Sequence, residues 1–429
     1  MSISGHAETA VQTKVFRVEQ FRNPEISAER RKELEAAEAE PVDLSVESIL
    51  EDAKAQTGLS DFGSMDFTER LAQLAGEVAA NDNLWRHSKA RMRASFVKAA
   101  ANRLKNKAFL DATPQVEAVK IDRPIIIVGL PRSGTTHLEN LIASDRRLRH
   151  LPVYLGAEAV PTLGETAGPD GRDPRWVRSN AHWERMSQNA IMAAMHEHSP
   201  DHACGENELQ MPDFTTYQWE WMAEVPGWRD YYLSHDQTPH YAYGKHMLKA
   251  IAYQFPSERR WILKGNQHSE QLPALIANYP DAYIVQIHRD PLAIIQSVLT
   301  MRGLSILNDQ KHPDIKAHVD YWVDRIERML RAYIRDMDKV PQGQRLDILF
   351  GDVIADDVGT AQKVLEFAGL PSTPESVADM REYMDSHPRG KDGRVVYDLA
   401  GDFNLDVAAL RERFAFYHEA FPYKEEVKP

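Results

Sequence analysis

The sequence is poor in cysteine, in long apolar runs and in net positive charge. Its single cysteine, Cys204, cannot form an intrachain disulfide, and the first residues lack the apolar segment that a secretory signal peptide requires. The longest uninterrupted apolar stretch, around residues 125–128, is far shorter than the roughly 20 residues that cross a bilayer. We therefore expect a cytoplasmic protein without a transmembrane helix.

The charge balance is acidic. Lys and Arg total 51 against 64 Asp and Glu, which gives a formal net charge of −13. Such a chain is a poor general binder of nucleic acid or of an anionic membrane. The composition, 43% hydrophobic and 27% charged over 429 residues, is that of a globular protein with one large or two ordinary domains.

The first quarter of the chain has a helical pattern. Residues 15–40 are dense in Glu, Arg and Ala, which predicts an exposed helix or a frayed arm, and residues 43–110 have an amphipathic helical period. After Pro114, β-branched runs alternate with helical patterns, which is typical of an α/β sheet. We expect a helical N-terminal extension over residues 1–118 and one domain over residues 119–429.

Four nearly continuous apolar runs predict parallel strands that are buried on both faces. These runs are residues 124–130, 260–265, 282–289 and 346–352. Residues 152–250 are rich in Trp, Tyr, His, Met and Pro without a clear period, and we interpret them as a lid or an acceptor-binding region. The expected fold class is α/β, a P-loop-like parallel sheet flanked by helices.

A glycine loop follows the first predicted strand. Gly129 and Gly134 have the spacing of G-x-x-x-x-G-K-[ST], and an amphipathic helix begins directly after them. Glycine allows several backbone N–H groups to turn inward at a helix N-terminus, so the pattern predicts a phosphate site. Thr135 stands where nucleoside triphosphatases have a lysine, which argues against hydrolysis of ATP or GTP. The alternative is a tight strand-to-helix turn without a ligand.

A second anion site is predicted at the end of the strand at residues 282–289. Asp290 and Pro291 suit the N-cap and first position of a helix, so Arg289 lies at the carboxyl edge of the sheet, where ligands bind. Ser297, two turns further on, can face the same anion. The alternative is a capped helix with a surface arginine. A kinase catalytic loop is excluded, because Ile295 stands where a kinase has asparagine.

These two motifs resemble those of the sulfotransferases that use 3′-phosphoadenosine-5′-phosphosulfate (PAPS). The segment PRSGTT is similar to the family's 5′-phosphosulfate loop, and the helical N-terminus with its GLSDFG turn is similar to a bacterial branch of the family. The resemblance implies that Arg289 and Ser297 hold the 3′-phosphate. It assigns the 5′-phosphosulfate to Arg132, Ser133, Gly134, Thr135 and Thr136, with Arg132 contacting the outer anionic group.

A glycine-containing basic loop near the C-terminus is a third candidate phosphate contact. In the family such a loop closes over the 3′-phosphate, so the resemblance implies a role for Arg389, Gly390 and Lys391, and extends to Arg394. The alternative is a solvated cluster of charges.

The catalytic candidates are Lys264 and His268. Transfer of a sulfuryl group needs a deprotonated acceptor oxygen and stabilisation of charge on the sulfuryl and bridging oxygens. In the bacterial family a strand-end lysine is followed by a histidine, which implies that Lys264 stabilises this charge and that His268 is the general base. The chain departs from the family's usual Ser-Pro after the lysine, because Gly265 and Asn266 stand there.

Two carboxylates compete with His268 for the role of base. Glu206 and Glu208 lie in the lid-like region, and an acidic pair recurs there in related bacterial sequences. Residues at i and i+2 do not share a helix face, so we expect only one of them to enter the site.

A cluster of His196, His198, His202 and Cys204 has ligand types that suit zinc, but its spacing matches no standard zinc module. We therefore expect no metal and interpret the cluster as lining for the acceptor pocket, with histidines at the surface. Six aromatic residues nearby are candidates either for an apolar acceptor pocket or for the core. They are Tyr217, Trp219, Trp221, Trp228, Tyr231 and Tyr232.

Together the motifs predict transfer of a sulfuryl group from PAPS to a hydroxyl of a small, partly apolar acceptor. The alternatives are a nucleotide-dependent small-molecule kinase and a noncatalytic nucleotide-binding protein. The expected partner is the small-molecule acceptor and not a nucleic acid, and a homodimer stays open.

Overall fold

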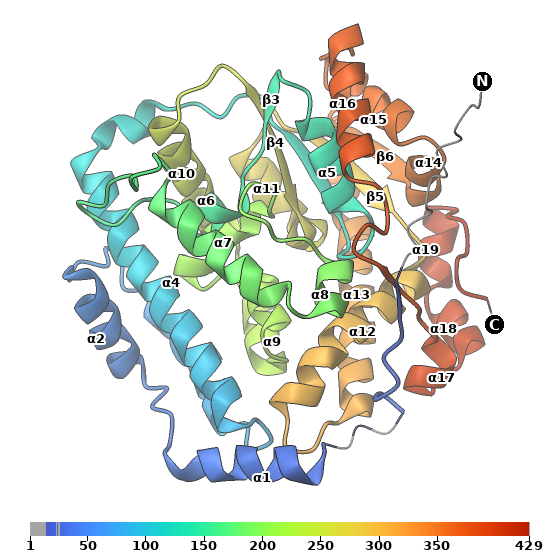
Figure 1. Ribbon diagram of the computed structural model, residues 1–429. Helices are drawn as coiled ribbons and strands as arrows, with labels where there is room; N and C mark the ends of the chain where they lie inside the picture. Colours follow the sequence, from blue (N-terminus) through green and yellow to red (C-terminus); the bar gives the residue numbers. More distant parts are fainter. Residues whose placement is uncertain (1–13, 23, 25, 429) are drawn as a thin grey trace, which may run out of the picture.

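The computed structural model describes the whole chain except residues 1–13, 23, 25 and 429 (Figure 1). At its centre is a five-stranded sheet with the order β3-β4-β2-β5-β6, in which every pair of neighbours is parallel. The strands are β2 (Ile125–Gly129), β3 (Leu148–Arg149), β4 (Arg260–Gly265), β5 (Tyr283–His288) and β6 (Arg345–Leu349). The predicted α/β class is confirmed.

Strand β2 divides its side chains between two cores. Ile125 and Ile127 face one cluster, Ile126 and Val128 face another, and all four are fully buried. This alternation requires helices on both faces of the sheet, which explains the continuous apolar run in the sequence. One face is covered by α5 (Thr135–Ala143), α15 (Asp357–Phe367) and α16 (Pro374–Ser386), and the other by α10 (Thr238–Gln254) and α11 (Leu272–Asn278).

The strand predictions differ from the structure at three places. The short strand β3 was not predicted, and it pairs with the start of β4. The run at residues 346–352 ends as a strand at Leu349, because α14 (Phe350–Ala355) begins at the next residue. Strand β6 lies at the edge of the sheet and is mostly half-buried, so the expected burial on both faces was wrong there.

The N-terminal part is mostly helical. Its elements are α1 (Ala28–Ala36), the short 3₁₀ turn η1 (Ala37–Ala39), α2 (Val46–Thr57), α3 (Phe67–Ala80), α4 (Arg86–Ala112) and η2 (Pro114–Ala118). The prediction of a helix or arm from residue 15 was wrong at its start. β1 (Val15–Phe16) is a strand and pairs in parallel with β7 (Arg394–Val395), so an N-terminal and a C-terminal segment meet there.

The region between β3 and β4 is also helical. It contains α6 (Val153–Ala157), α7 (Pro174–Met186), α8 (Ala190–Met195), η3 (Glu206–Asp213), η4 (Tyr217–Trp221) and α9 (Pro226–Ser234). Trp219, Trp228 and Tyr232 are buried in one core cluster with the N-terminal helices. These three aromatics are therefore core residues.

Two long helices follow β5, and short ones end the chain. They are α12 (Pro291–Asp309), α13 (Ile315–Asp336), η6 (Met337–Lys339), α17 (Leu399–Phe403), α18 (Val407–Arg413) and α19 (Ala415–Ala420). No helix in the described part of the chain combines the length and apolar character needed to cross a membrane.

Candidate active site

The glycine loop joins β2 to α5 at the carboxyl edge of the sheet. Arg132 and Gly134 both have positive φ, 67° and 90°, and the buried Ser133 fixes the turn by donating from Oγ to the Leu130 carbonyl at 2.6 Å. A Cβ at Gly134 would lie 2.8 Å from the ring of Phe350, so the close approach requires glycine here. The loop therefore presents backbone N–H groups at the N-terminus of α5, a geometry that suits an anion.

The two predicted phosphate motifs meet at Arg132. Its Nε donates to Ser297 Oγ at 3.0 Å, and its carbonyl oxygen accepts from Arg289 Nη1 at 2.6 Å. Strands β2 and β5 are direct neighbours, so residues more than 150 positions apart in sequence converge at one sheet edge. The structure thus brings Arg132, Arg289 and Ser297 together.

Arg289 also binds an acid from the C-terminal tail. Its Nε and Nη2 donate to the two carboxylate oxygens of Glu426, both at 2.7 Å, and its guanidinium lies 4.0 Å above the ring of Phe350. The tail is fixed at the start of α12 because the backbone N–H of Glu426 donates to Asp290, the N-cap residue, at 2.7 Å. The carboxylate of Glu426 thus binds the arginine that the sequence analysis assigns to a phosphate.

Lys264 lies beside the glycine loop. It is the penultimate residue of β4, it is buried, and its Nζ donates to Thr136 Oγ1 in the first turn of α5 at 3.1 Å. The departure from the usual Ser-Pro has a structural consequence, because Asn266 Nδ2 donates to the Gly129 carbonyl at 2.7 Å. Asn266 therefore ties the end of β4 to the phosphate loop.

His268 lies in a closed polar cluster behind the strand end. The residue is 1% exposed, its Nδ1 is 2.8 Å from the Tyr241 hydroxyl, and its Nε2 is 3.2 Å from Glu206 Oε1. The other oxygen of Glu206 accepts from the Tyr279 hydroxyl at 3.3 Å. Two of the three predicted bases, His268 and Glu206, are thus neighbours, and both of them are buried.

Two further carboxyl groups, those of Glu208 and Glu139, interact electrostatically with Lys264. Burial raises the pKa of Glu208 to about 7 and that of Glu139 to about 8, while the charge of Lys264 acts in the opposite direction. Neither carboxylate oxygen of Glu139 has a hydrogen-bond partner among the described residues. Sequence reasoning missed Glu139, and the available signal was an acidic residue within the apolar helix after the glycine loop.

A buried ion network supports the segment after Lys264. η5 (Asn266–Glu270) ends at Glu270, which binds Arg325 of α13 through two hydrogen bonds of 2.5 and 2.6 Å. Arg325 Nε also donates to both oxygens of Glu220, at 2.9 and 3.0 Å, and its side chain is fully buried. Removal of one partner would leave an unpaired buried charge, which would destabilise the fold strongly. The network therefore holds η5 against α13.

The predicted C-terminal loop lies close to α5 and to the histidine segment. Arg389 Nη2 donates to Asp357 at 2.5 Å, and the same carboxylate accepts from His137 of α5 at 2.8 Å. Lys391 Nζ lies 3.1 Å from Glu197 Oε2. Across the described residues, the histidines, cysteine and acids form no group that could hold a metal ion.

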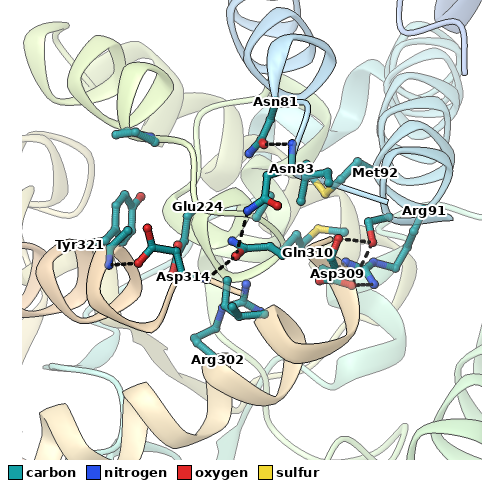
Figure 2. Close-up of a pocket in the computed structure, with 17 residues that line it drawn as sticks. Asn81, Asn83, Arg91, Met92, Glu224, Arg302, Asp309, Gln310, Asp314 and Tyr321 are labelled. Carbon is teal, nitrogen blue, oxygen red and sulfur yellow. Dashed lines mark hydrogen bonds and ion pairs between the residues drawn. The ribbon is translucent and has the colours of Figure 1, made fainter. Parts of the chain in front are cut away.

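A separate cavity of about 290 Å³ lies between the N-terminal helices and α12 and α13 (Figure 2). Arg91 and Asp309 form an ion pair at its wall, with hydrogen bonds of 2.7 and 2.8 Å, and Arg302 also lines it. None of the predicted site residues lines this cavity. It is therefore distinct from the site at the glycine loop.

Fold and site together define the class of protein. A parallel sheet with a glycine loop at its carboxyl edge, next to two arginines, is typical of α/β proteins that bind a nucleotide phosphate. The sequence model of the sulfotransferase family matches residues 124–375, and the chain belongs to this family. It is a sulfotransferase, an enzyme that transfers a sulfuryl group to a hydroxyl acceptor, so the sulfotransferase prediction is confirmed over the kinase and the noncatalytic alternatives.

Named relatives agree with this assignment. The chain is 23% identical over 276 residues to omega-hydroxy-beta-dihydromenaquinone-9 sulfotransferase Stf3 of Mycobacterium tuberculosis and of Mycobacterium bovis, covering 63% of this chain and 69% of the relative. Sulfotransferase STF9 from Mycobacterium avium has a similar structure, with a TM-score of 0.79, 22% identity and coverage of 90% and 99%. For STF1 from Mycobacterium tuberculosis H37Rv the TM-score is 0.70 at 25% identity, with coverage of 87% and 98%.

Proposed function

We propose that the sulfuryl donor is PAPS and that the glycine loop holds its 5′-phosphosulfate. The observation that supports this most is the convergence of Arg132, Arg289 and Ser297 at one sheet edge, beside a loop without the triphosphatase lysine. Two arginines at one sheet edge would serve a nucleotide that carries phosphate on both its 5′ and 3′ sides. Ser133, Gly134, Thr135 and Thr136 complete the loop. Arg389, Gly390 and Lys391 are proposed to close over the 3′-phosphate.

Lys264 is proposed to stabilise the charge that develops as the sulfuryl group moves. Its ammonium group is held by Thr136 in the first turn of α5, adjacent to the loop that would bind the transferred group. A fixed cation in a buried site stabilises developing negative charge more strongly than it would in water. Arg132 is proposed to contact the outer oxygens of the same group. The assignment of the base to His268, Glu206 or Glu208 stays a prediction.

The proposed acceptor is a small, partly apolar molecule with a hydroxyl group. The acidic net charge of −13 disfavours a sulfated polysaccharide. The mycobacterial relatives act, by name, on omega-hydroxy-beta-dihydromenaquinone-9. We also propose a cytoplasmic enzyme whose residues 1–118 form an extension packed on the domain at residues 119–429. Arg70 and Arg103 of this extension both bind Asp213, each at 2.8 Å.

Ligand-dependent thermal stability tests the donor assignment. PAPS and its product 3′-phosphoadenosine-5′-phosphate (PAP) should raise Tm, while ATP with magnesium should change it little, because at equal concentration a ligand that binds the folded state more tightly stabilises it more. Equal shifts with ATP and with PAPS would contradict the proposal.

A further inference from the structure

The segment that follows α8 is attached directly to the proposed phosphate site. Arg132 Nη1 of the glycine loop donates to the carbonyl oxygen of Met195, the last residue of α8, at 2.7 Å. Further along, Asn140 of α5 donates from Nδ2 to His202 Nε2 at 3.1 Å. The backbone on either side of His196 and His198 is therefore fixed relative to the loop that would hold the sulfuryl group.

His196 has a defined tautomer and one free ring nitrogen. Its Nδ1 lies 3.0 Å from the carbonyl oxygen of Glu197, which can only accept, so Nδ1 carries the hydrogen in the neutral ring. Nε2 then has the lone pair, and it has no hydrogen-bond partner in the part of the chain that the structure describes. The ring stacks on that of His198, with centroids 4.1 Å apart and planes inclined by 26°. The residue is half-buried and so keeps more solvent exposure than His268.

The surroundings keep this imidazole neutral. The charged and titratable groups around it are Arg132 of the glycine loop, Lys264 of β4, His198 and His202 of its own segment, and Glu197, which Lys391 of the C-terminal loop binds. Burial, with the neighbouring charges of His198, Arg132 and Lys264, holds the pKa of His196 well below its usual 6.5. Burial also lowers the pKa of His198 to about 4.

The other candidate histidine is enclosed. Nδ1 of His268 is hydrogen-bonded to the Tyr241 hydroxyl. Nε2 lies 3.2 Å from Glu206 Oε1 without a hydrogen bond among the described residues, and only 1% of the residue is exposed. By contrast, His196 directly follows Met195, whose carbonyl oxygen accepts from Arg132 at 2.7 Å, and the charges of Arg132 and Lys264 both act to lower its pKa.

We propose that His196, through Nε2, is the base that accepts the proton of the acceptor hydroxyl. This inference rests on the proposed function. The acceptor O–H bond breaks and its proton passes to His196 Nε2, while the acceptor oxygen forms a bond to sulfur. The bond from sulfur to the bridging oxygen breaks, and its electron pair leaves with the nucleotide phosphate. His198 supports the ring by stacking and is a positioning residue.

The proposal couples donor binding to the basicity of His196. A nucleotide anion bound between Arg132 and Lys264 would offset their charge, and the pKa of the imidazole would then rise toward the range of an effective general base. Binding of PAP should therefore take up protons near pH 6. Calorimetry of PAP binding in two buffers with different ionisation enthalpies measures this uptake, and the His196→Gln variant should show at most half of the wild-type value.

Kinetics of His196→Gln, His268→Gln and a matched control give the decisive comparison. The control is His182→Gln, because His182 is an exposed histidine of the neighbouring helix α7. With an unactivated alcohol as acceptor, His196→Gln should lower kcat by about 10²-fold or more, and with an acidic phenol by much less, because a phenol ionises without help. Its Kd for PAP should change by less than about threefold, and the control should behave as wild type.

Separate outcomes distinguish this inference from the proposed function. A wild-type enzyme that transfers no sulfuryl group from PAPS would overturn both. If the wild type is active, the base assignment alone is overturned by any of three results: near-normal turnover of the alcohol by His196→Gln, an equal loss with both acceptors, or unchanged proton uptake. Loss of the alcohol reaction in His268→Gln with normal turnover in His196→Gln would return the role to His268.

Discussion

Replacement of Glu426 by glutamine should strengthen binding of a nucleotide that carries a 3′-phosphate. Glu426 binds Arg289 through two hydrogen bonds of 2.7 Å, and the two side chains are 31% and 21% exposed. A bidentate, charge-assisted pair that is partly open to solvent contributes roughly 0.5–1.5 kcal/mol. If Arg289 must exchange this carboxylate for the 3′-phosphate, Glu426→Gln should lower the Kd for PAP by about 2- to 10-fold.

Calorimetry with PAP and with adenosine 5′-phosphosulfate, which lacks the 3′-phosphate, isolates this effect. Only PAP binding should respond to Glu426→Gln. Glu425→Gln is the matched control, because Glu425 lies in the same tail but 3.7 Å from Arg411 instead of Arg289. Arg289→Ala should weaken PAP binding by roughly 1.5–3 kcal/mol and should abolish the effect of the Glu426 change.

An unchanged or weaker affinity for PAP in Glu426→Gln would refute this reasoning. It would show that Glu426 holds Arg289 in position for the nucleotide and does not compete with it. An equal response of adenosine 5′-phosphosulfate would show that Arg289 does not face the 3′ side.

Three further predictions concern charge inside the protein. Lys264→Ala should lower kcat by about 10²-fold or more with a much smaller change in PAP affinity, since its charge acts mainly in the transition state; steady-state kinetics and calorimetry measure the two effects. Arg325→Met should lower the free energy of unfolding by about 3–5 kcal/mol, because it leaves Glu220 and Glu270 without their buried partner, as denaturant unfolding will show. Glu139→Gln should flatten the dependence of stability on pH between about 4.5 and 8. The pKa of Glu139 in the folded protein is raised to about 8, so folding favours the protonated acid. The wild-type protein therefore loses stability as pH rises through this window, and the variant should not.

Each of these predictions has its own control. A large loss of PAP affinity at normal kcat would reduce Lys264 to an anchor. Arg328→Met, at a position on α13 that is 46% exposed, should cost less than about 1 kcal/mol, and an equal cost at both arginines would contradict the role of burial. Glu366→Gln, at an exposed position on α15, should leave the pH profile of stability unchanged. A wild-type profile in Glu139→Gln would show that Glu139 is not the group that titrates.

The parts of the fold that the sequence predicted are those with a local signal. The apolar run at β4 predicted its bounds correctly, and the glycine spacing after β2 predicted the strand-to-helix turn. Both patterns depend on neighbours within a few residues, since burial on two faces requires consecutive apolar residues and positive φ favours glycine. The convergence of Arg289 and Arg132 was also predictable, because ligands bind at the carboxyl edge of a parallel sheet.

What the sequence could not predict depends on contacts between distant segments. The two-residue strands β1 and β7 have no period to detect, and they exist because two segments almost 380 positions apart pair with each other. Glu426 lies in a charged tail, and only the fold brings it to Arg289. The enclosure of His268 by Tyr241 and Glu206 likewise depends on α10 and η3, which lie far from β4 in sequence.

The transfer of labelled sulfate from PAPS tests the central claim most directly. The protein is incubated with PAPS that carries ³⁵S, together with a panel of phenols and alcohols, and both the labelled acceptor and the released PAP are quantified. Our account predicts that label appears on an acceptor hydroxyl with one PAP formed for each sulfate transferred, and that this transfer is lost in Lys264→Ala. Absence of transfer to every acceptor, or transfer of phosphate from ATP in its place, would contradict it.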